Sequence, residues 1–588
     1  MSQLNQRRAR KRTIIIVSFS LLWLLGIVLR LIQLQVIDHA RLRENVIDQN
    51  QYISTISPKR GTIYDRKGTI LARSIPSYSV YYSPLEDEPL EDETLEAQFQ
   101  KIYRLRRLLG LSSDHLKEIK ARIRKDVPFI WIKRKIDPEL TQKVKDLRLT
   151  GISFIEENSR FYPHGKGASF ILGRVDIDGI GQSGVELAYN TKLAGENGKR
   201  LILRDAKQRE YHFVTQKEPK PGTDLILTID ETIQYIAEKE LEQTVLETKA
   251  KWGTVIICQP STGEILAMAN CPSYDLNSLP PNPLLLDRNP AIHNIFDPGS
   301  TFKIVTFAAA IESQSIDFNE EFDCSLGFIP VAGKKFMDHK KFGVLSFPEV
   351  IIHSSNVGTI QVGQRLGRKN LYQTIKDFGF GERTGIDLPV EERGIFSSAG
   401  SWSRLSLASL SIGYEISVTA IQMLQAINTI ANGGVVTAPR IVKKILDPSS
   451  GEETNFRRFK RVISEETAHN LRVFLEKVVQ EGTGQAAQVK GYRIIGKTGT
   501  AQKFDPSIKA YTSSAHVASF VGFVLVEKPL FSIAVVIDDP QGLYYGGQVA
   551  APLFQKIASR LLQYLRIPPK DIPHETIIAS KAWSPDQR

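Results

Sequence analysis

Ser300 and Lys303 are the first residues in this chain whose types and spacing suit catalysis. They lie in the segment DPGSTFK, immediately before the apolar run IVTFAAAI. Pro-Gly followed by Ser is typical of a helix start, and positions i and i+3 share a helix face. A serine becomes a nucleophile beside a base, and a lysine can be that base if burial or a second cation lowers its pKa from about 10.4 toward about 7–8. Alone, the pair has a plain alternative, a capping serine and a surface lysine.

Two further polar motifs follow in order. The S-S-N motif (354–356) begins 54 residues after the first serine, and G-K-T-G-T (496–500) follows the strand-like YRII. The helix start at Ser300 would supply free backbone N–H groups for a developing oxyanion. Lys497 is a candidate for the second cation that lowers the pKa of Lys303. Taken alone, the S-S-N motif is also consistent with a polar turn.

The third motif resembles a nucleotide-binding loop by chance. Residues 491–498 satisfy G-x-x-x-x-G-K-[ST], a pattern whose mechanism requires a loop between a strand and a helix. The four middle positions are bulky and strand-prone, and residues 500–506 (TAQKFDP) lack a helical pattern. We therefore expect no phosphate-binding loop here.

The amino terminus predicts the topology. Residues 13–29 carry no charge over 17 positions, which is about 26 Å of helix and near the lower limit for crossing a bilayer. Arg30 interrupts the run, but LIQLQVI continues the apolar pattern and an arginine at a helix end can extend to the interface. No small-x-small cleavage site follows, as a signal peptide would need. We expect one uncleaved anchor over 13–37.

A basic segment over 1–12 precedes this anchor. It holds five cations and no acid: Arg7, Arg8, Arg10, Lys11 and Arg12. Cations before a span place the amino terminus in the cytoplasm. The protein is then expected in the cytoplasmic membrane, with everything after the anchor on the extracytoplasmic (periplasmic) side, because no later stretch approaches 18 apolar residues.

Composition limits the remaining options. The 588 residues are 42% hydrophobic and 24% charged, which is ordinary for a globular, multidomain chain. The net charge of +12 suits an anionic polymer, and outside the cytoplasm a wall polymer is a better candidate than nucleic acid. The three cysteines fit no zinc motif and no disulfide scaffold, although one Cys258–Cys271 bridge is allowed by the spacing.

The elements that must position the motifs fall into two regions. Residues 38–225 mix short strand-like runs with Gly and Pro, with a helical insertion near 85–150. Residues 226–567 begin with a helix capped by Asp230 and a predicted hairpin, and they end with two strands and an amphipathic helix. Strands at both ends of this region imply one sheet closed by distant segments. We expect residues 568–588 to form a loose tail.

S-x-x-K, S-x-N and K-T-G in this order resemble the signature of penicillin-binding proteins and serine β-lactamases. The resemblance covers nearly the whole predicted ectodomain, and its pedestal resembles that of class B, monofunctional penicillin-binding proteins. These segments carry the pedestal resemblance: RGTIYDRKG (60–68), RFYP (160–163) and GQSGVE (181–186). These segments resemble the division-specific, septal transpeptidase: GKRL with LRD (198–205), GYEISVT (413–419) and YYGGQVAAP (544–552). One departure is Phe296-Asp297, where the family usually has Tyr-Glu.

The resemblance implies a fold and a set of roles. The fold is an α+β pedestal followed by an α/β acyltransferase domain, in which helices flank a five-stranded antiparallel sheet. Ser300 would attack the penultimate D-Ala carbonyl of a peptidoglycan stem peptide, and Lys303 would take its proton. Ser354 would relay a proton under the influence of Lys497, and Asn356 would hold the donor amide.

The same resemblance implies the substrate contacts and the partners. Lys497, Thr498, Gly499 and Thr500 would receive the substrate carboxylate, and the backbone N–H groups of Ser300 and Thr500 would form the oxyanion hole. Expected partners are peptidoglycan stem peptides ending in D-Ala-D-Ala, β-lactam antibiotics, a SEDS-type membrane glycan polymerase and other division proteins. No metal, cofactor or nucleic acid is expected.

Three alternatives remain at this point. An elongation-type transpeptidase would share the signature. A β-lactamase or carboxypeptidase would use the same residues with water as the acceptor, although the anchor and the long pedestal argue against it. A β-lactam sensor or a division scaffold would use the ectodomain mainly for binding.

Overall fold

The computed structural model describes residues 2–39, 41, 51–84, 95–125, 127, 129–204, 210–280, 287–446, 459–505, 507 and 510–569. The chain forms two compact units and enters each of them more than once. The first unit comprises Met1–Lys59, Ile75–Ser159 and Gly195–Pro221, and the second comprises Arg60–Ser74, Arg160–Ala194 and Gly222–Arg588. The expected pedestal range, 38–225, contributes residues to both units. Most of the expected tail lies outside the described residues.

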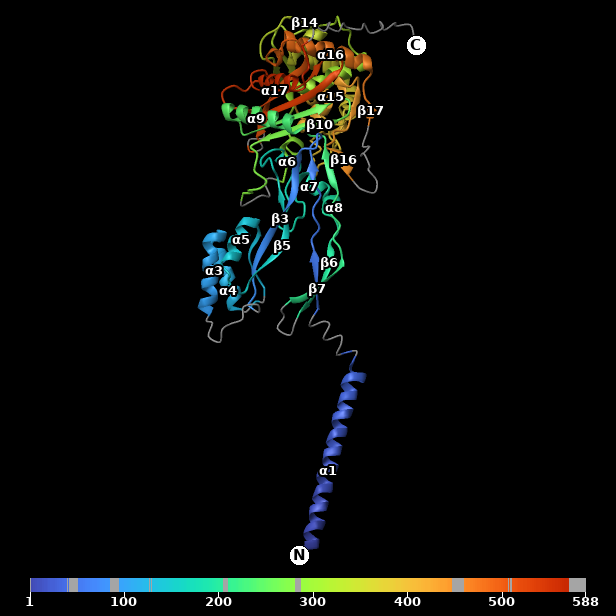
Figure 1. The fold of residues 1–588 in the computed structure, drawn as a ribbon. Coiled ribbons are helices and arrows are strands. Elements are labelled where there is room, and N and C mark those ends of the chain that lie inside the picture. Colours follow the sequence, from blue (N-terminus) through green and yellow to red (C-terminus); the bar gives the residue numbers. More distant parts are fainter. Residues whose placement is uncertain are drawn as a thin grey trace. The chain divides into compact units, whose positions relative to one another are not determined.

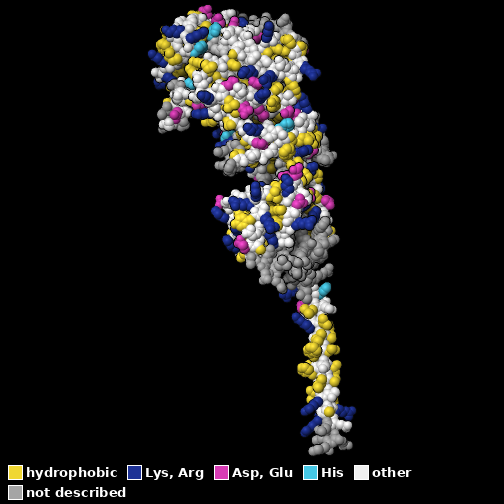
Figure 2. Space-filling view, turned by 60° about the vertical axis from the view of Figure 1, so that its left-hand side comes forward, with side chains coloured by type: hydrophobic (Ala, Val, Ile, Leu, Met, Phe, Trp, Pro, Cys, Tyr) yellow, Lys and Arg dark blue, Asp and Glu magenta, His cyan; other side chains and the backbone are white. Residues whose placement is uncertain are grey.

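The amino-terminal helix α1 (Ser2–Ile32), continued by the π-helical turn η1 (Gln33–Ile37), is the candidate membrane span. Its large apolar side chains are exposed, among them Phe19 and Trp23, and no other described helix is long and apolar enough to cross a bilayer. Figure 2 shows hydrophobic side chains along the visible face of this helix and Lys and Arg side chains near its start. A helix that is apolar on every side and unburied is typical of lipid contact, and the protein is membrane-anchored.

Among the described residues, the first unit also holds a three-stranded sheet, part of a six-stranded sheet and three helices. The antiparallel strands β1 (Gln51–Ile56), β6 (Gly198–Arg204) and β7 (Glu210–Lys217) form one sheet in that order. The end of β3 (Ile70–Tyr82) pairs with β4 (Ile130–Ile136) and with β5 (Ile152–Phe161). The helices are α3 (Leu95–Leu109), α4 (Ser113–Arg124) and α5 (Pro138–Asp146).

Strand β4 lies inside the segment that the sequence analysis expected to be helical. Its residues Ile130, Ile132 and Ile136 are buried in one apolar core together with one face of each neighbouring helix. The run IWIKRKI is too short and too basic to stand out as a strand by periodicity, so only its packing reveals it.

The second unit is built on the expected five-stranded antiparallel sheet (Figure 1). Its strands, in spatial order, are β10 (Glu264–Cys271), β9 (Trp252–Gln259), β20 (Pro529–Asp538), β19 (Ala510–Leu525) and β18 (Arg493–Asp505). The first two strands form the expected hairpin, and the last three lie more than 200 residues later. Distant segments therefore close the sheet, as the strand pattern predicts.

Helices cover both faces of this sheet because its strands are apolar on both sides. Val255 and Ile257 of β9 face α9 (Glu231–Thr248) and α17 (Ala550–Tyr564), whereas Ile256 and Cys258 face the opposite core. Asp230 caps α9, since its Oδ1 accepts hydrogen bonds from the first backbone N–H groups of the helix. All three cysteines are free thiols, so the Cys258–Cys271 bridge is not formed.

The other helices of the second unit build the opposite core and carry two of the motifs. Helical elements are α6 (Ser169–Leu172), α7 (Gly184–Ala188), α8 (Asn190–Leu193), α10 (Pro290–His293), η3 (Gly299–Phe302), α11 (Lys303–Glu312), α12 (Phe347–Ile352), α13 (Asn356–Asp377), η4 (Ala399–Ser401), α14 (Ser406–Ser411), α15 (Ala420–Ala431), α16 (Glu465–Gln480) and η5 (Gln485–Ala487). Short strands are β2 (Ile63–Tyr64), β8 (Asp224–Leu227), β11 (Glu321–Asp323), β12 (Phe328–Val331), β13 (Lys334–Met337), β14 (Val344–Ser346), β15 (Val435–Thr437), β16 (Val442–Leu446) and β17 (Phe459–Arg461).

A buried ion cluster joins the three pedestal-type segments within the second unit. Glu186, which is completely buried, accepts hydrogen bonds from Arg60 Nε and Arg160 Nε, each at 2.6 Å. Arg60 also donates to the Gly179 carbonyl oxygen at 3.0 Å and to Asn190 Oδ1 at 2.8 Å. Two cations on one buried carboxylate, with further hydrogen bonds, satisfy charges that would otherwise be costly to bury.

Candidate active site

Ser300 lies on the 3-10 turn η3, one residue after a glycine in the left-handed region. Gly299 has a φ of +52°, and a Cβ there would lie 3.1 Å from both Ala501 Cβ and the Thr500 carbonyl oxygen. Strand β18 thus passes too close to the turn for a larger residue. The Gly299 N–H donates to the Gly413 carbonyl oxygen at 3.0 Å, which fixes the turn from the other side.

The Ser300 hydroxyl is half-buried and makes no side-chain hydrogen bond within the described part of the chain. The sequence analysis expected Ser300 and Lys303 to be hydrogen-bonded as a nucleophile and its base. Among the described residues, the structure shows no such hydrogen bond. Free enzymes often form such contacts only once substrate is bound. The hydroxyl is unpaired and available to a ligand.

Lys303 is the first residue of α11 and is completely buried. Its Nζ donates to the Ser354 carbonyl oxygen at 2.7 Å, to Asn356 Oδ1 at 2.8 Å and to Ser354 Oγ at 3.4 Å. Burial lowers the pKa of Lys303 to about 7, although the charge of Asp338 works in the opposite direction. A lysine in this state is half neutral near pH 7 and can accept a proton.

Lys497 lies in the middle of β18 and is also completely buried. Its Nζ donates to Ser354 Oγ at 2.8 Å and to the Thr498 carbonyl oxygen at 3.1 Å. Burial, and then the positive charge of Lys303, hold the pKa of Lys497 well below its usual value. The sequence analysis allowed either burial or a second cation as the cause of a lowered Lys303 pKa; burial is the main cause for both lysines, and the charge of Lys303 adds to it at Lys497.

The S-S-N motif is a strained turn at the start of α13. Ser354 has a φ of +58°, which lies in the left-handed region of the backbone map. Residues other than glycine adopt this conformation at a cost in energy, and such strained residues cluster at functional sites. Ser355 caps the helix, since its Oγ accepts a hydrogen bond from the Gly358 N–H at 2.9 Å. The turn aims the Ser354 hydroxyl at both lysines, so this motif is more than the polar turn that it resembles in sequence.

Asp338 is a residue of this site that sequence reasoning missed. Its carboxylate accepts hydrogen bonds from Ser355 Oγ at 2.8 Å, from the Val357 N–H at 3.1 Å and from the Asn356 N–H. A carboxylate at a helix N-terminus compensates the unpaired N–H groups and the helix dipole. An acid within the basic stretch KKFMDHKK carries no sequence signal for this role.

The T-G-T part of the third motif follows Lys497 along the edge strand β18. Thr498 Oγ1 shares a 2.6 Å hydrogen bond with Thr483 Oγ1, and Thr500 Oγ1 accepts one from the Gly546 N–H at 2.9 Å. A Cβ on Gly499 would lie 2.5 Å from Ser519 Oγ, which leaves room only for glycine. Because the motif is in mid-strand, the structure also rules out a phosphate-binding loop at 491–498.

Asp297, the residue that departs from the family pattern, anchors the nucleophile turn. Its two carboxylate oxygens accept hydrogen bonds from Ser417 Oγ at 2.8 Å and from Tyr511 Oη at 2.6 Å. Burial raises the pKa of Asp297 above its usual value. The chain segment before Ser300 is thereby tied to the 413–419 segment and to β19.

The structure therefore gathers all eight predicted site residues around three elements, the η3 turn with α11, the start of α13 and β18. This arrangement suits acyl transfer through an ester on Ser300. Lys303 can accept a proton, and Lys497 can position Ser354, which lies between the two lysines. Among the described residues, no group of three His, Cys, Asp or Glu side chains is arranged to hold a metal ion.

Comparisons with known proteins agree with this geometry. Residues 253–559 match the family described as penicillin binding protein transpeptidase domain, and residues 55–227 match the family described as penicillin-binding protein dimerisation domain.

Similar relatives match over most of their length. Stage V sporulation protein D of Bacillus subtilis is 34% identical over 95% of this chain and 87% of the relative. A protein of Neisseria meningitidis serogroup A named probable peptidoglycan D,D-transpeptidase PenA is 33% identical over 92% of this chain and 91% of the relative. The crystal structure of penicillin binding protein 3 of Mycobacterium tuberculosis with aztreonam is similar with a TM-score of 0.67 and 27% identity, covering 90% of this chain and 100% of that one.

Proposed function

This chain belongs to the class B penicillin-binding proteins and is a serine-type peptidoglycan D,D-transpeptidase, and we propose that it cross-links stem peptides at the division septum through an ester on Ser300. The observation that carries the proposed mechanism is the chain of contacts Lys303–Ser354–Lys497, which begins three residues after Ser300. It combines a buried lysine whose pKa is lowered to about 7 with a polarised hydroxyl that can pass a proton onward.

In the first step Ser300 Oγ attacks the carbonyl carbon of the penultimate D-Ala, and Lys303 Nζ takes the hydroxyl proton. The backbone N–H groups of Ser300 and Thr500 stabilise the oxyanion. The C–N bond to the terminal D-Ala then breaks, and its nitrogen leaves as an amine after receiving a proton through Ser354 Oγ. An amine from a neighbouring strand attacks the ester in the second step, forms the cross-link and restores the serine.

Substrate binding is proposed to use the edge of β18. A peptide that adds along this edge would place its terminal carboxylate at Lys497, Thr498 and Thr500. Gly499 permits the close approach of neighbouring chain segments, since it has no side chain to fill the site. The Asn356 side-chain amide donates a 2.8 Å hydrogen bond to the Met337 carbonyl oxygen, which orients the side chain. In this orientation Asn356 would hold the amide of the donor stem peptide.

β-Lactam antibiotics are proposed inhibitors, since a strained cyclic amide with a carboxylate matches the same contacts and leaves an ester that no amine resolves. The similar structure from Mycobacterium tuberculosis was solved with aztreonam and with ampicillin. The catalytic unit is proposed to lie outside the cytoplasm, because five cations precede the α1 span. A SEDS-type glycan polymerase is the proposed membrane partner.

Labelling of the full-length protein with a fluorescent penicillin tests the proposed chemistry. We expect a stable label with the native chain and none with Ser300→Ala. Ser313→Ala, at the end of the same helix, is the matched control and should label normally. Labelling that persists in Ser300→Ala would refute the assignment of the nucleophile, and a label that is released within seconds would indicate a hydrolase.

Depletion of the protein in its own cells tests the septal role. Loss of a septal transpeptidase should give filaments without septa, and a Ser300→Ala copy should fail to restore division. Rounded cells would indicate the elongation role instead, and normal division with the Ser300→Ala copy would indicate a scaffold.

A further inference from the structure

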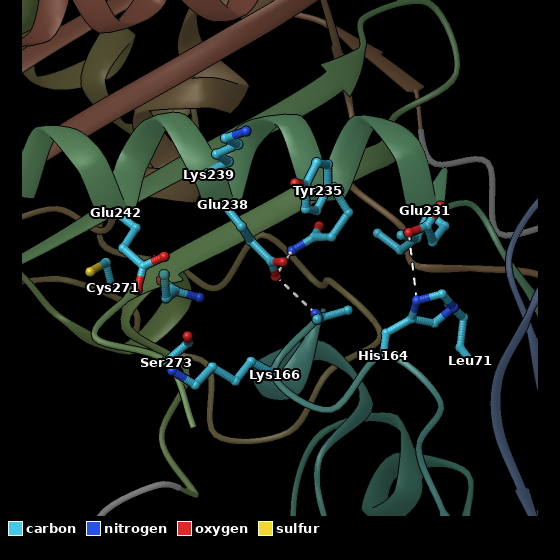
Figure 3. Close-up of a pocket in the computed structure, with 15 residues that line it drawn as sticks. Leu71, His164, Lys166, Glu231, Tyr235, Glu238, Lys239, Glu242, Cys271 and Ser273 are labelled. Carbon is cyan, nitrogen blue, oxygen red and sulfur yellow. Dashed lines mark hydrogen bonds and ion pairs between the residues drawn. The ribbon is translucent and has the colours of Figure 1, made fainter. Parts of the chain in front are cut away.

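A cavity of about 590 Å³ lies in the second unit between α9, the 164–168 loop and the end of β10 (Figure 3). Strands β10 and β18 are the two opposite edges of the five-stranded sheet, so about 19 Å of sheet separates this cavity from the strand that carries Lys497. The volume falls in the range of about 300–1,000 Å³ that is typical of small-molecule sites. The acyl-transfer chemistry makes no use of it.

We propose that this cavity is a second binding site, which takes a primary ammonium group carried on a short flexible chain. Three carboxylates on one face of α9 line it: Glu231, Glu238 and Glu242. Their spacings of seven and four residues place them along the same side of the helix. Figure 3 shows Glu238 and Glu242 extending from α9 toward the 164–168 loop and β10, whereas Lys239 points away from them.

Glu238 is a partly buried carboxylate that has no cationic partner among the described residues. Its Oε1 accepts hydrogen bonds from the Ala168 N–H at 2.8 Å and from Gln234 Nε2 at 2.7 Å. Within the described part of the chain no ion pair reaches it, and burial together with the charges of Glu231 and Glu242 raises the pKa of Glu238. A buried carboxylate surrounded by other acids is costly unless a positive group compensates it.

Asn270 provides an independent indication of a missing donor. The side chain lines the same cavity and is only 5% exposed. Its Nδ2 donates to Asn289 Oδ1 at 3.1 Å, but its Oδ1 accepts no hydrogen bond from any described residue. Buried acceptors are rarely left unpaired. An ammonium group has three donors and no acceptor, so it can satisfy such acceptors together with a carboxylate.

The arrangement of the other charges favours an organic cation over a metal ion. No three His, Cys, Asp or Glu side chains in the described residues are close enough together to ligate a metal. His164 Nδ1 lies 3.6 Å from Glu231 Oε1 and so already accompanies that acid. Lys166 faces the cavity from the opposite side, and no ion pair joins it to the three glutamates in the described structure.

Lys166 distinguishes between two sources of the ammonium group, because it can bind only a ligand that also carries a carboxylate. A free diamine would use only the acidic side of the cavity. An amino acid or a peptide from the cell wall would place its ammonium group at Glu238 and a carboxylate at Lys166. Cadaverine and Nα-acetyl-L-lysine represent these two sources, because they share the alkyl ammonium and differ in the carboxylate.

Titration calorimetry of the full-length protein in detergent micelles, with each of these two probes, tests the proposal. We expect saturable binding of at least one probe, weakened about tenfold or more by Glu238→Gln, because a charge-assisted hydrogen bond is lost. Glu247→Gln changes an exposed acid on the same helix that does not line the cavity, and it should bind like the native chain. Lys166→Met should weaken only Nα-acetyl-L-lysine if the natural ligand is an amino acid or a peptide.

Two controls keep the result interpretable. Thermal unfolding should show that Glu238→Gln is at least as stable as the native chain, since it removes an uncompensated buried charge. Glu242→Gln, at an exposed position on the rim, should also weaken binding without affecting the fold. Absence of saturable binding of both probes at tens of millimolar, or equal affinities for Glu238→Gln and Glu247→Gln, would overturn the proposal.

Discussion

Replacing Lys497 by methionine separates the two causes that can lower the pKa of Lys303. Methionine has a similar length but no charge. If burial sets the pKa of Lys303, as the structure indicates, the acylation rate should keep its dependence on pH in this variant. If the second ammonium group sets it, the dependence should move to higher pH.

The expected profile follows from a Lys303 pKa of about 7. About a tenth of Lys303 is neutral at pH 6, half at pH 7 and about nine tenths at pH 8, so the second-order acylation constant should rise about tenfold from pH 6 to pH 8. The pKa is lowered, so the active, neutral form is gained as the pH rises. Burial and the charge of Lys303 also hold the pKa of Lys497 well below its usual value.

In Lys497→Met the plateau of the constant should fall by about 10²–10⁴, the usual contribution of one group to proton transfer. Ser354 Oγ loses its 2.8 Å donor in this variant, and the proposed contact between Lys497 and the substrate carboxylate is lost. The midpoint should stay within about half a unit of 7, because the burial of Lys303 is unchanged.

Stopped-flow acylation with a fluorescent penicillin, measured in steps from pH 5.5 to pH 9.5 at constant ionic strength, gives both the plateau and the midpoint. Thr512→Ser, at a half-exposed position of β19, serves as a control that should retain both values. A midpoint that moves toward 10 in Lys497→Met would refute the reasoning, because it would mean that repulsion by Lys497, and not burial, makes Lys303 a base.

Three further predictions concern two residues of the site and the buried ion cluster around Glu186. Asp338→Asn removes the charge that raises the pKa of Lys303, so the midpoint of the acylation profile should move below 7; an upward shift in the same titration would contradict the assigned electrostatics. Glu186→Gln leaves two buried arginines without their carboxylate and should cost about 3–5 kcal/mol, which lowers the thermal unfolding midpoint measured by calorimetry; an unchanged midpoint would mean that the cluster is not stabilising. Gly499→Ala should abolish labelling, since its Cβ would lie 2.5 Å from Ser519 Oγ, and Ser519→Ala added to it should restore part of the rate; normal labelling by the single variant would show that β18 can shift.

Motif order and spacing were enough to select the candidate site residues. Lys303, Ser354 and Lys497 meet in space although about 200 residues separate the first from the last, and no single motif would have sufficed. The sheet was also predictable, because its strands are long, apolar runs bounded by turn residues. The shorter strand β4 was not, since burial against neighbouring helices defines it.

The supporting groups of the site could not be predicted. Asp338 reaches α13 from the β12–β13 hairpin, and Tyr511 reaches Asp297 from β19. Neither contact leaves a pattern in the local sequence. The sequence analysis named burial or a second cation as the cause of a lowered Lys303 pKa but could not choose between them, because composition and spacing do not tell how completely a side chain is buried.

The order of strands in the sheet has a consequence for biogenesis. The inner strand β9 pairs with β10 beside it in the chain, but its other neighbour is β20, with Gly253 opposite Ile537. Closing a loop of about 280 residues costs about 5 kcal/mol of chain entropy, and an anchored chain emerges from the membrane with its amino-terminal end first. In the proposed orientation, one edge of β9 therefore stays unpaired until nearly the whole polypeptide has crossed the membrane, and an exposed strand edge is prone to aggregation. Export in that orientation should depend on factors that shield this edge, and any chain ending before residue 529 should lack the strand that joins β9 and β10 to β19 and β18.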